Sequence, residues 1–202
     1  MNKAEYAHPS ILHYDVRTMV RRRTTKALRQ LGFRRIANME RPRDLSQIVK
    51  QRQFELAVFT ADANDDGTAK LVCRAGRYNT SSDPFTPMIL VSWNSASDMV
   101  QKALNTGTDQ ILVWPFTTEQ LGARVEALIN ARKPFVETES YLATGRRDPQ
   151  RLVGADQSFE VPNALRARDE GRPDLAPAPM PLNWPGQAWN GSKLPTLPCG
   201  SM

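Results

Sequence analysis

Short apolar runs alternate along the chain with stretches in which apolar residues recur at helical spacing, and this alternation predicts its elements. Five runs indicate strands, at residues 11–14, 36–39, 56–59, 88–92 and 111–113. The helical stretches carry apolar residues at Val20, Ala27, Leu28 and Leu31, at Leu45, Ile48 and Val49, at Leu71 and Val72, at Met99, Val100, Ala103 and Leu104, and at Leu121, Val125, Leu128 and Ile129. Strands that alternate with helices predict parallel pairing and right-handed crossovers, and therefore an α/β fold on a doubly wound five-stranded sheet.

Composition divides the chain into three parts. We predict a lead-in at residues 1–9, one domain at residues 10–133, and an extension at residues 134–202. Seven of the last thirty residues are prolines, beginning at Pro173, and they are mixed with Gly, Ala, Asn and Ser. Such a segment has no periodicity and cannot continue a helix or a central strand, so it predicts an irregular tail.

Positive charge is concentrated near the start. The chain has 202 residues and a net charge of +6, whereas residues 16–39 alone contain eight basic residues and no acid. Such an excess suits nucleic acid, an anionic membrane surface or an acidic protein. No helix-turn-helix pattern, zinc knuckle or RNA-binding aromatic motif accompanies it, which argues against nucleic acid and favours an acidic protein or the chain's own tail.

Other features limit the class of protein. No apolar run approaches the roughly 18 residues of a membrane helix, and no apolar signal region follows the first residues, so we expect a cytoplasmic protein without a membrane span. Two cysteines, Cys73 and Cys199, form no disulfide framework, and two histidines leave little basis for a metal centre. The sequence therefore predicts neither a metal nor a cofactor.

The carboxyl ends of the predicted strands are where a doubly wound sheet binds its ligands. The residues at or beyond these ends are Asp15, Val16, Thr60, Asp62, Ser92, Trp93, Trp114, Pro115 and Phe116. Three stretches among and around them, at 87–92, 105–113 and 115–121, resemble the receiver domain of bacterial response regulators, the CheY-like family. The resemblance covers roughly residues 10–132, and the spacing of these stretches agrees with it.

The resemblance implies a phosphorylation pocket, which this sequence keeps only in part. Receivers carry two acids after the first strand, a phosphoacceptor aspartate ending the third, a hydroxyl residue ending the fourth, and a lysine before a proline after the fifth. Asp15 and Ser92 match this pattern. Val16 stands for the second acid, Thr60 for the phosphoacceptor, and Trp114 for the lysine. The resemblance also implies a cis peptide bond before Pro115, and an aromatic residue where this chain has Ile111.

The absence of the second acid, the phosphoacceptor aspartate and the lysine argues against phosphotransfer. Receiver phosphorylation uses Mg²⁺, which binds carboxylates and phosphate oxygens, and two of the three expected carboxylates are absent. A threonine hydroxyl cannot form an acyl phosphate, and the indole of Trp114 cannot pair with phosphate as lysine does. We therefore interpret the chain as a degenerate pseudo-receiver without enzymatic activity.

Asp62 offers an alternative phosphoacceptor. It lies two residues beyond Thr60, and the period-two alternation of a strand would keep the direction of its side chain after a register shift. The apolar run at 56–59 argues against that shift, and Trp114 would still lack the lysine's charge. We prefer to interpret Asp62, Asp65 and Asp66 as solvated loop residues, with a turn at Asp66-Gly67.

Several residues suit contact with a partner. Tryptophan is frequent at interfaces, so Trp114 is either a plug or partner anchor or a core residue that fills the space of the lysine. The segments 134–138, 141–148 and 160–166 resemble an extension found after some alphaproteobacterial single-receiver proteins, which suits docking onto the receiver or onto another chain. The partner-binding candidates are Trp93, Trp114, Ile111, Arg21, Arg22, Arg23, Tyr141, Arg146 and Arg147.

The sequence thus predicts a signalling protein that acts by protein–protein interaction in a two-component, phosphorelay-type pathway. Its expected partners are other proteins, such as a signalling or a chemotaxis or flagellar component, or a second copy in a homodimer. Two alternatives remain: a receiver phosphorylated at Asp62, and a basic module that binds nucleic acid or a membrane surface through the arginine-rich first helix.

Overall fold

The computed structural model of the protein describes residues 10–52, 54–61, 85–93, 107–132, 134–138, 141–144, 158–159 and 163–170. The predicted helices around Leu71 and Met99 lie outside these ranges, as do the lead-in at 1–9 and the proline-rich tail. Among the helices that are described, none is both long enough and apolar enough to cross a membrane.

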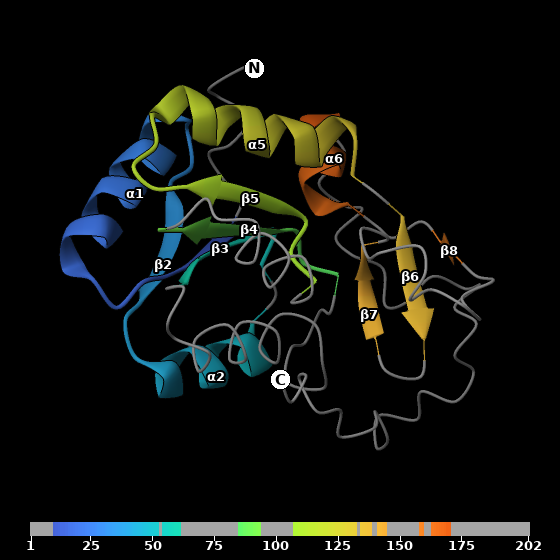
Figure 1. Cartoon of the computed structure of the whole chain (residues 1–202), viewed down its shortest axis with the longest axis horizontal. Helices are drawn as coiled ribbons and strands as arrows, with labels where there is room; N and C mark the ends of the chain where they lie inside the picture. Colours follow the sequence, from blue (N-terminus) through green and yellow to red (C-terminus); the bar gives the residue numbers. More distant parts are fainter. Residues whose placement is uncertain are drawn as a thin grey trace.

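A five-stranded parallel sheet forms the centre of the molecule (Figure 1). Its strands are β1 (Ser10–Tyr14), β2 (Arg35–Met39), β3 (Leu56–Ala61), β4 (Met88–Ser92) and β5 (Gln110–Val113). They follow the order β2-β1-β3-β4-β5, and every neighbouring pair is parallel. The structure thus confirms the predicted doubly wound sheet, with β2 and β5 as its edges.

Helices cover both faces of the sheet (Figure 1). Helices α1 (Thr18–Gln30) and α5 (Thr118–Asn130) lie on one face, where their apolar side chains meet Ile11, Val58, Ile89 and Leu112 in one buried cluster. Helix α2 (Pro42–Gln51) lies on the other face, over a second cluster that includes Leu12, Phe59 and Leu90. Burial on both faces explains why the strands are nearly uninterrupted apolar runs.

The ends of α1 and α5 show how the sequence fixes these helices. Two residues after α1, Gly32 has a φ of 102° in the left-handed region, and Phe33 N–H donates to the Leu28 carbonyl at 3.1 Å. This is a Schellman ending, in which glycine takes the left-handed conformation that other residues rarely adopt. Helix α5 begins with a capping box between Thr117 and Gln120.

Part of the extension packs against the domain. Strands β6 (Phe135–Thr138), β7 (Tyr141–Thr144) and β8 (Ser158–Phe159) form an antiparallel sheet in the order β7-β6-β8, followed by α6 (Ala164–Asp169). The side chain of Leu165 is 1% exposed and belongs to the cluster beneath α1 and α5. Asn163 Nδ2 donates to the Leu128 carbonyl of α5 at 2.7 Å. This part of the extension therefore contributes to the core of the domain.

A buried ion pair lies at the amino-terminal ends of β4 and β5, next to the start of the extension. Arg132 Nε lies 3.1 Å from Asp109 Oδ1, and both side chains are almost fully buried. The other carboxylate oxygen of Asp109 accepts from Met88 N–H at 2.8 Å, while Arg132 Nη2 donates to the Phe85 carbonyl at 2.6 Å. The guanidinium also lies 4.9 Å from the ring centre of Phe135. Segments that begin β4, β5 and β6 thus meet at one arginine.

Candidate functional site

Asp15, the retained acid of the predicted pocket, lies just beyond β1 and holds the turn into α1. Its side chain is 1% exposed, and Oδ1 accepts from Arg17 N–H at 2.7 Å. Its carbonyl accepts from Arg21 Nη1 at 2.8 Å. Oδ2 is buried and has no hydrogen-bond partner among the described residues. The carboxylate therefore satisfies a backbone donor at the start of α1.

Thr60 and Ser92 occupy neighbouring strands in different rows of the sheet. Thr60 pairs with Val91, whereas Ser92 pairs with Ala61 and Val113, so the two hydroxyl residues belong to alternating rows. Thr60 is 5% exposed, and its hydroxyl has no hydrogen-bond partner within the described part of the chain. Strand β3 continues through Ala61, so Thr60 is not its last residue.

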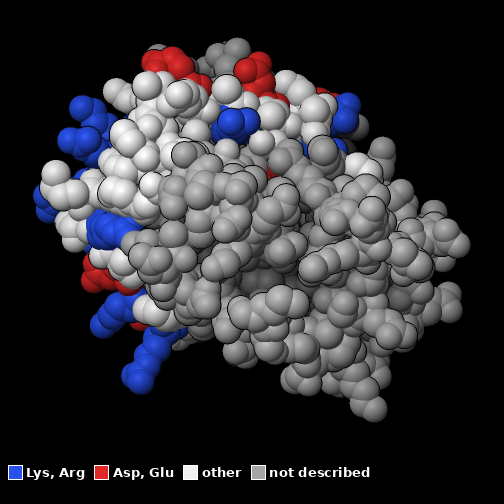
Figure 2. All heavy atoms as spheres, in the orientation of Figure 1, with Lys and Arg blue, Asp and Glu red and all other residues white. Residues whose placement is uncertain are grey.

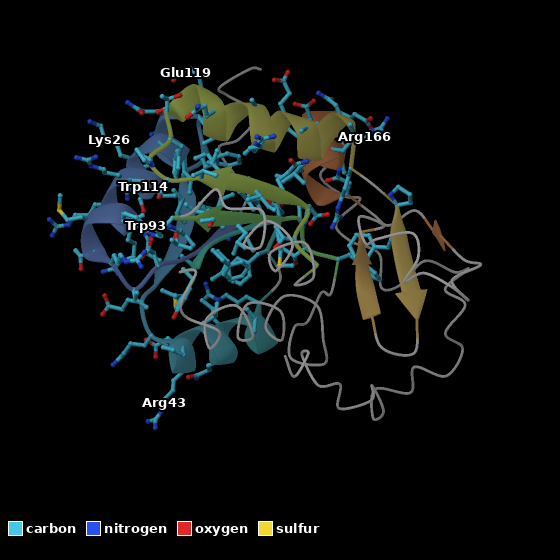
Figure 3. All side chains as sticks on the ribbon, in the orientation of Figure 1. Lys26, Arg43, Trp93, Trp114, Glu119 and Arg166 are labelled. Carbon is cyan, nitrogen blue, oxygen red and sulfur yellow. The ribbon has the colours of Figure 1, made fainter. Side chains whose placement is uncertain are left out.

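Three aromatic rings and one guanidinium line the carboxyl ends of β4 and β5. The ring centres of Trp93 and Trp114 are 5.6 Å apart, and those of Trp114 and Phe116 are 5.2 Å apart in an edge-to-face arrangement. The Arg17 guanidinium lies 4.4 Å from the ring centre of Trp93. Figure 3 shows the two tryptophans side by side next to α1. We call Arg17, Trp93, Trp114 and Phe116 the aromatic row.

Trp114 is half-buried and packs against the cluster under α1 and α5. It precedes Pro115 through a cis peptide bond, as the resemblance implied. Sequence reasoning missed Arg17 and Phe116 as members of the row. The only feature of the sequence that could have pointed to these two residues was their position in the chain, since Arg17 is the first of the basic stretch and Phe116 follows Pro115. The row comes from three separate segments, which no local pattern can bring together.

The described residues at these strand ends offer few oxygen ligands for a cation. Mg²⁺ requires several oxygen ligands, but one carboxylate oxygen of Asp15 already accepts from Arg17 N–H, and its neighbour Val16 is apolar and 56% exposed. The described residues contain no group of three His, Cys, Asp or Glu side chains that could hold a metal ion. At the lysine position the indole of Trp114 packs against other rings. Asp62 lies outside the described residues.

The partner-binding candidates fall into different environments. Trp93 is 38% exposed, and Arg22 and Arg23 are exposed on α1. Arg21 is instead tied to the fold, with Nη2 at 2.7 Å from Glu40 Oε2. Ile111 is half-buried and packs against the cluster under α2. Tyr141 begins β7, whereas Arg146 and Arg147 lie outside the described ranges.

A buried histidine lies beneath α1, beside the candidate site. His13 Nδ1 is 2.9 Å from Asn38 Oδ1, which also accepts from Thr25 Oγ1 at 2.8 Å. Burial lowers the pKa of His13 to about 4, against the smaller opposing effects of the Asn38 hydrogen bond and of Asp15. The imidazole is therefore neutral in the folded protein at neutral pH.

We expect this histidine to make stability depend on pH. Below the unfolded pKa of 6.5 the unfolded chain binds a proton that the folded chain does not accept until about pH 4. The contribution of His13 to the free energy of unfolding is therefore present above the unfolded pKa and is lost as the pH falls toward the folded pKa. The expected loss is about 2 kcal/mol between pH 7 and pH 5. Urea unfolding followed by circular dichroism across this range measures the slope.

A substitution identifies the group responsible. We expect His13→Gln to flatten the slope, because glutamine does not titrate in this range. If His13→Gln kept the full slope, another group would be the source of the pH dependence.

Comparison with solved structures identifies the fold. No model of a known protein family matches the chain, and no curated protein matches it in sequence. A receiver domain of a two-component histidine kinase from Clostridium thermocellum is similar, with a TM-score of 0.51 and 15% identity over 60% of this chain and 97% of that one. A CheY-like response regulator receiver from Methanospirillum hungatei has a TM-score of 0.51 and 19% identity over 59% and 92%.

A third similar structure is the receiver domain of an HD domain-containing protein from Pseudomonas fluorescens. It has a TM-score of 0.50 and 21% identity, over 59% of this chain and 93% of that one. These likenesses, together with the strand order, show that the protein has the fold of a CheY-like receiver domain. At these identities they show the fold alone.

Proposed function

We propose that the protein is a non-enzymatic signalling protein, an atypical receiver that acts through protein–protein contact in a two-component, phosphorelay-type pathway. In this proposal Thr60 is not phosphorylated. One observation carries it: among the described residues, these strand ends hold the buried Thr60, the buried carboxylate of Asp15, which accepts from Arg17 N–H, and the aromatic row. Each of these supports a site that does not bind phosphate.

The chemistry follows from these residues. An acyl phosphate forms when a carboxylate oxygen attacks phosphorus, and Thr60 presents a hydroxyl instead. The Asp15 side chain is 1% exposed and partly occupied by the start of α1, which makes it a poor second carboxylate for a cation. Exposed apolar side chains lie at the start of α1 and just after β4, namely those of Val16, Met19 and Trp93. Such exposed apolar groups are typical of surfaces that contact another protein.

The decisive test is exposure of the purified full chain to acetyl phosphate and Mg²⁺, followed by intact mass measurement, with a phosphorylatable receiver treated in parallel. We expect the control to gain a phosphoryl group and this chain to remain unmodified. Beryllofluoride with Mg²⁺ is expected to leave its tryptophan fluorescence unchanged.

Asp62→Ala separates this proposal from its alternative. A phosphorylated species that forms in the natural chain and is lost in Asp62→Ala would overturn the proposal and establish Asp62 as the phosphoacceptor. A modified species that persists in Asp62→Ala and is lost in Thr60→Ala would overturn it as well.

A further inference from the structure

Exposed apolar side chains gather at the amino-terminal end of α1. Met19 is 65% exposed and Val16 is 56% exposed, although the core-facing side of the helix is already buried through Val20, Ala27 and Leu28. Trp93, 38% exposed, is joined to this end of the helix by the Arg17 guanidinium. Val16 and Met19 thus leave apolar surface exposed at the end of α1 that Arg17 links to Trp93.

Exposed cations continue from this apolar group along the same helix. Arg22, Arg23, Lys26 and Arg29 are exposed and lie at the spacing of adjacent turns. None of them forms an ion pair within the described part of the chain, whereas Arg21 pairs with Glu40. Figure 2 shows basic side chains over α1, and Figure 3 shows Lys26 pointing away from the molecule. We call Val16, Met19, Trp93, Arg22, Arg23, Lys26 and Arg29 the α1 surface.

The charge arrangement of α1 is unfavourable for the isolated helix. Arg22 and Lys26 are four residues apart, a spacing at which like charges repel. The Asp15 carboxylate accepts from Arg17 N–H at the start of α1 and so complements the positive end of the helix dipole, which leaves the cations along the exposed face as the unfavourable element. A negatively charged partner would relieve this repulsion.

The composition of the proline-rich tail makes it a poor candidate for such a partner. Residues 171–202 contain one acid, Asp174, against Arg172 and Lys193, so the tail is slightly basic. A second copy carries the same net charge of +6 and is repelled overall. Charge complementarity therefore points to a different molecule.

The apolar half of the surface favours an acidic protein over nucleic acid. Contact between phosphates and the apolar side chains of Val16 and Met19 contributes no favourable free energy of burial, whereas an apolar side chain of a partner protein can cover them and does so favourably. The guanidinium of Arg17 already lies over the ring of Trp93, where a nucleobase would have to stack.

We infer that the α1 surface docks an acidic segment of a partner protein, in which an apolar side chain covers Met19 and Trp93 and carboxylates pair with Arg22, Arg23, Lys26 and Arg29. This inference rests on the proposed function and names the surface and the chemistry of the partner. Burial of the apolar group supplies affinity, and the cations speed association in a way that salt suppresses.

A library of short random peptides, displayed on phage and selected against the immobilised full chain, tests the inference. We expect the selected peptides to combine several Asp or Glu residues with at least one Leu, Ile, Phe or Trp. A selected peptide, synthesised with a fluorescent label, is expected to bind by anisotropy at low salt and to bind more weakly at high salt.

Variants locate the binding site. Arg22→Glu/Arg23→Glu and Met19→Ser are each expected to weaken the peptide by about tenfold or more, the equivalent of about 1.4 kcal/mol. Arg43→Glu/Arg124→Glu changes the net charge by the same amount through exposed arginines on α2 and α5, and it is expected to have little effect. Circular dichroism confirms that each variant is folded.

Several outcomes would overturn the inference. One is selection of peptides without acids, and another is equal weakening by the two double variants. Tighter binding of single-stranded DNA or of phosphatidylglycerol vesicles, lost in Arg22→Glu/Arg23→Glu, would assign the surface to nucleic acid or to a membrane. Phosphorylation by acetyl phosphate would overturn the proposed function and leave the peptide result standing, so the two failures are distinguishable.

Discussion

Arg132→Met is expected to lower the free energy of unfolding by about 3–5 kcal/mol, because breaking a buried ion pair removes the partner of a charge that has already lost its water. The Arg132 and Asp109 side chains are 5% and 2% exposed. The substitution removes the hydrogen bond to the Phe85 carbonyl as well, while Asp109 keeps the one from Met88 N–H. Urea unfolding followed by circular dichroism measures the change.

Two further variants make this result specific. Arg41→Met removes an exposed pair with Asp44 and is expected to leave the free energy of unfolding almost unchanged, because solvent screens such a pair. Asp109→Asn/Arg132→Met is expected to be more stable than Arg132→Met alone, because an asparagine carbonyl oxygen can still accept from Met88 N–H without a buried charge. Equal losses in Arg132→Met and Arg41→Met would contradict the structural role assigned to this ion pair.

Leu165→Ala is expected to destabilise the protein by about 2–5 kcal/mol, the usual cost of removing a buried leucine side chain. Leu165 belongs to α6, yet it is 1% exposed and lies in the cluster formed with α1 and α5. The loss should appear in the unfolding of the whole domain, measured by the same urea titration.

Arg166→Ala tests the neighbouring position. Arg166 is exposed and pairs with Glu170 one helical turn away, so its removal is expected to cost about 0.5 kcal/mol or less. If Leu165→Ala were no more harmful than Arg166→Ala, the extension would be an appendage and not part of the core.

The strands of the sheet could be predicted because each one is encoded by neighbouring residues in the sequence. Each strand is a short apolar run, and the observed bounds of β4 are those that the pattern indicated. The extension was harder to interpret, because β8 has two residues and α6 has six, too few for a periodic pattern. Its aromatic and arginine residues suggested docking, but only the structure shows Phe135 and Leu165 buried against the domain.

The sequence was enough to choose the strand ends as the candidate site, but it could not predict which side chains contact one another there. Strand ends and the family pattern led to Asp15, Thr60 and Trp114. The contacts that define the site join distant segments: Arg17 reaches Trp93, and His13 meets Asn38 beneath α1. Such contacts depend on the register of β1 with β2 and on the order of the strands, which a linear pattern does not contain.

The position of β2 at the edge of the sheet has a consequence for self-association. Its outer side has no neighbouring strand within the described residues, and exposed backbone donors and acceptors on such a strand can template the addition of another chain. The exposed Arg34 and Arg35 stand where β2 begins, so a second copy added parallel to β2 in the same register would bring its own arginines beside them. Charge repulsion at this edge therefore disfavours parallel, in-register stacking of copies through β2.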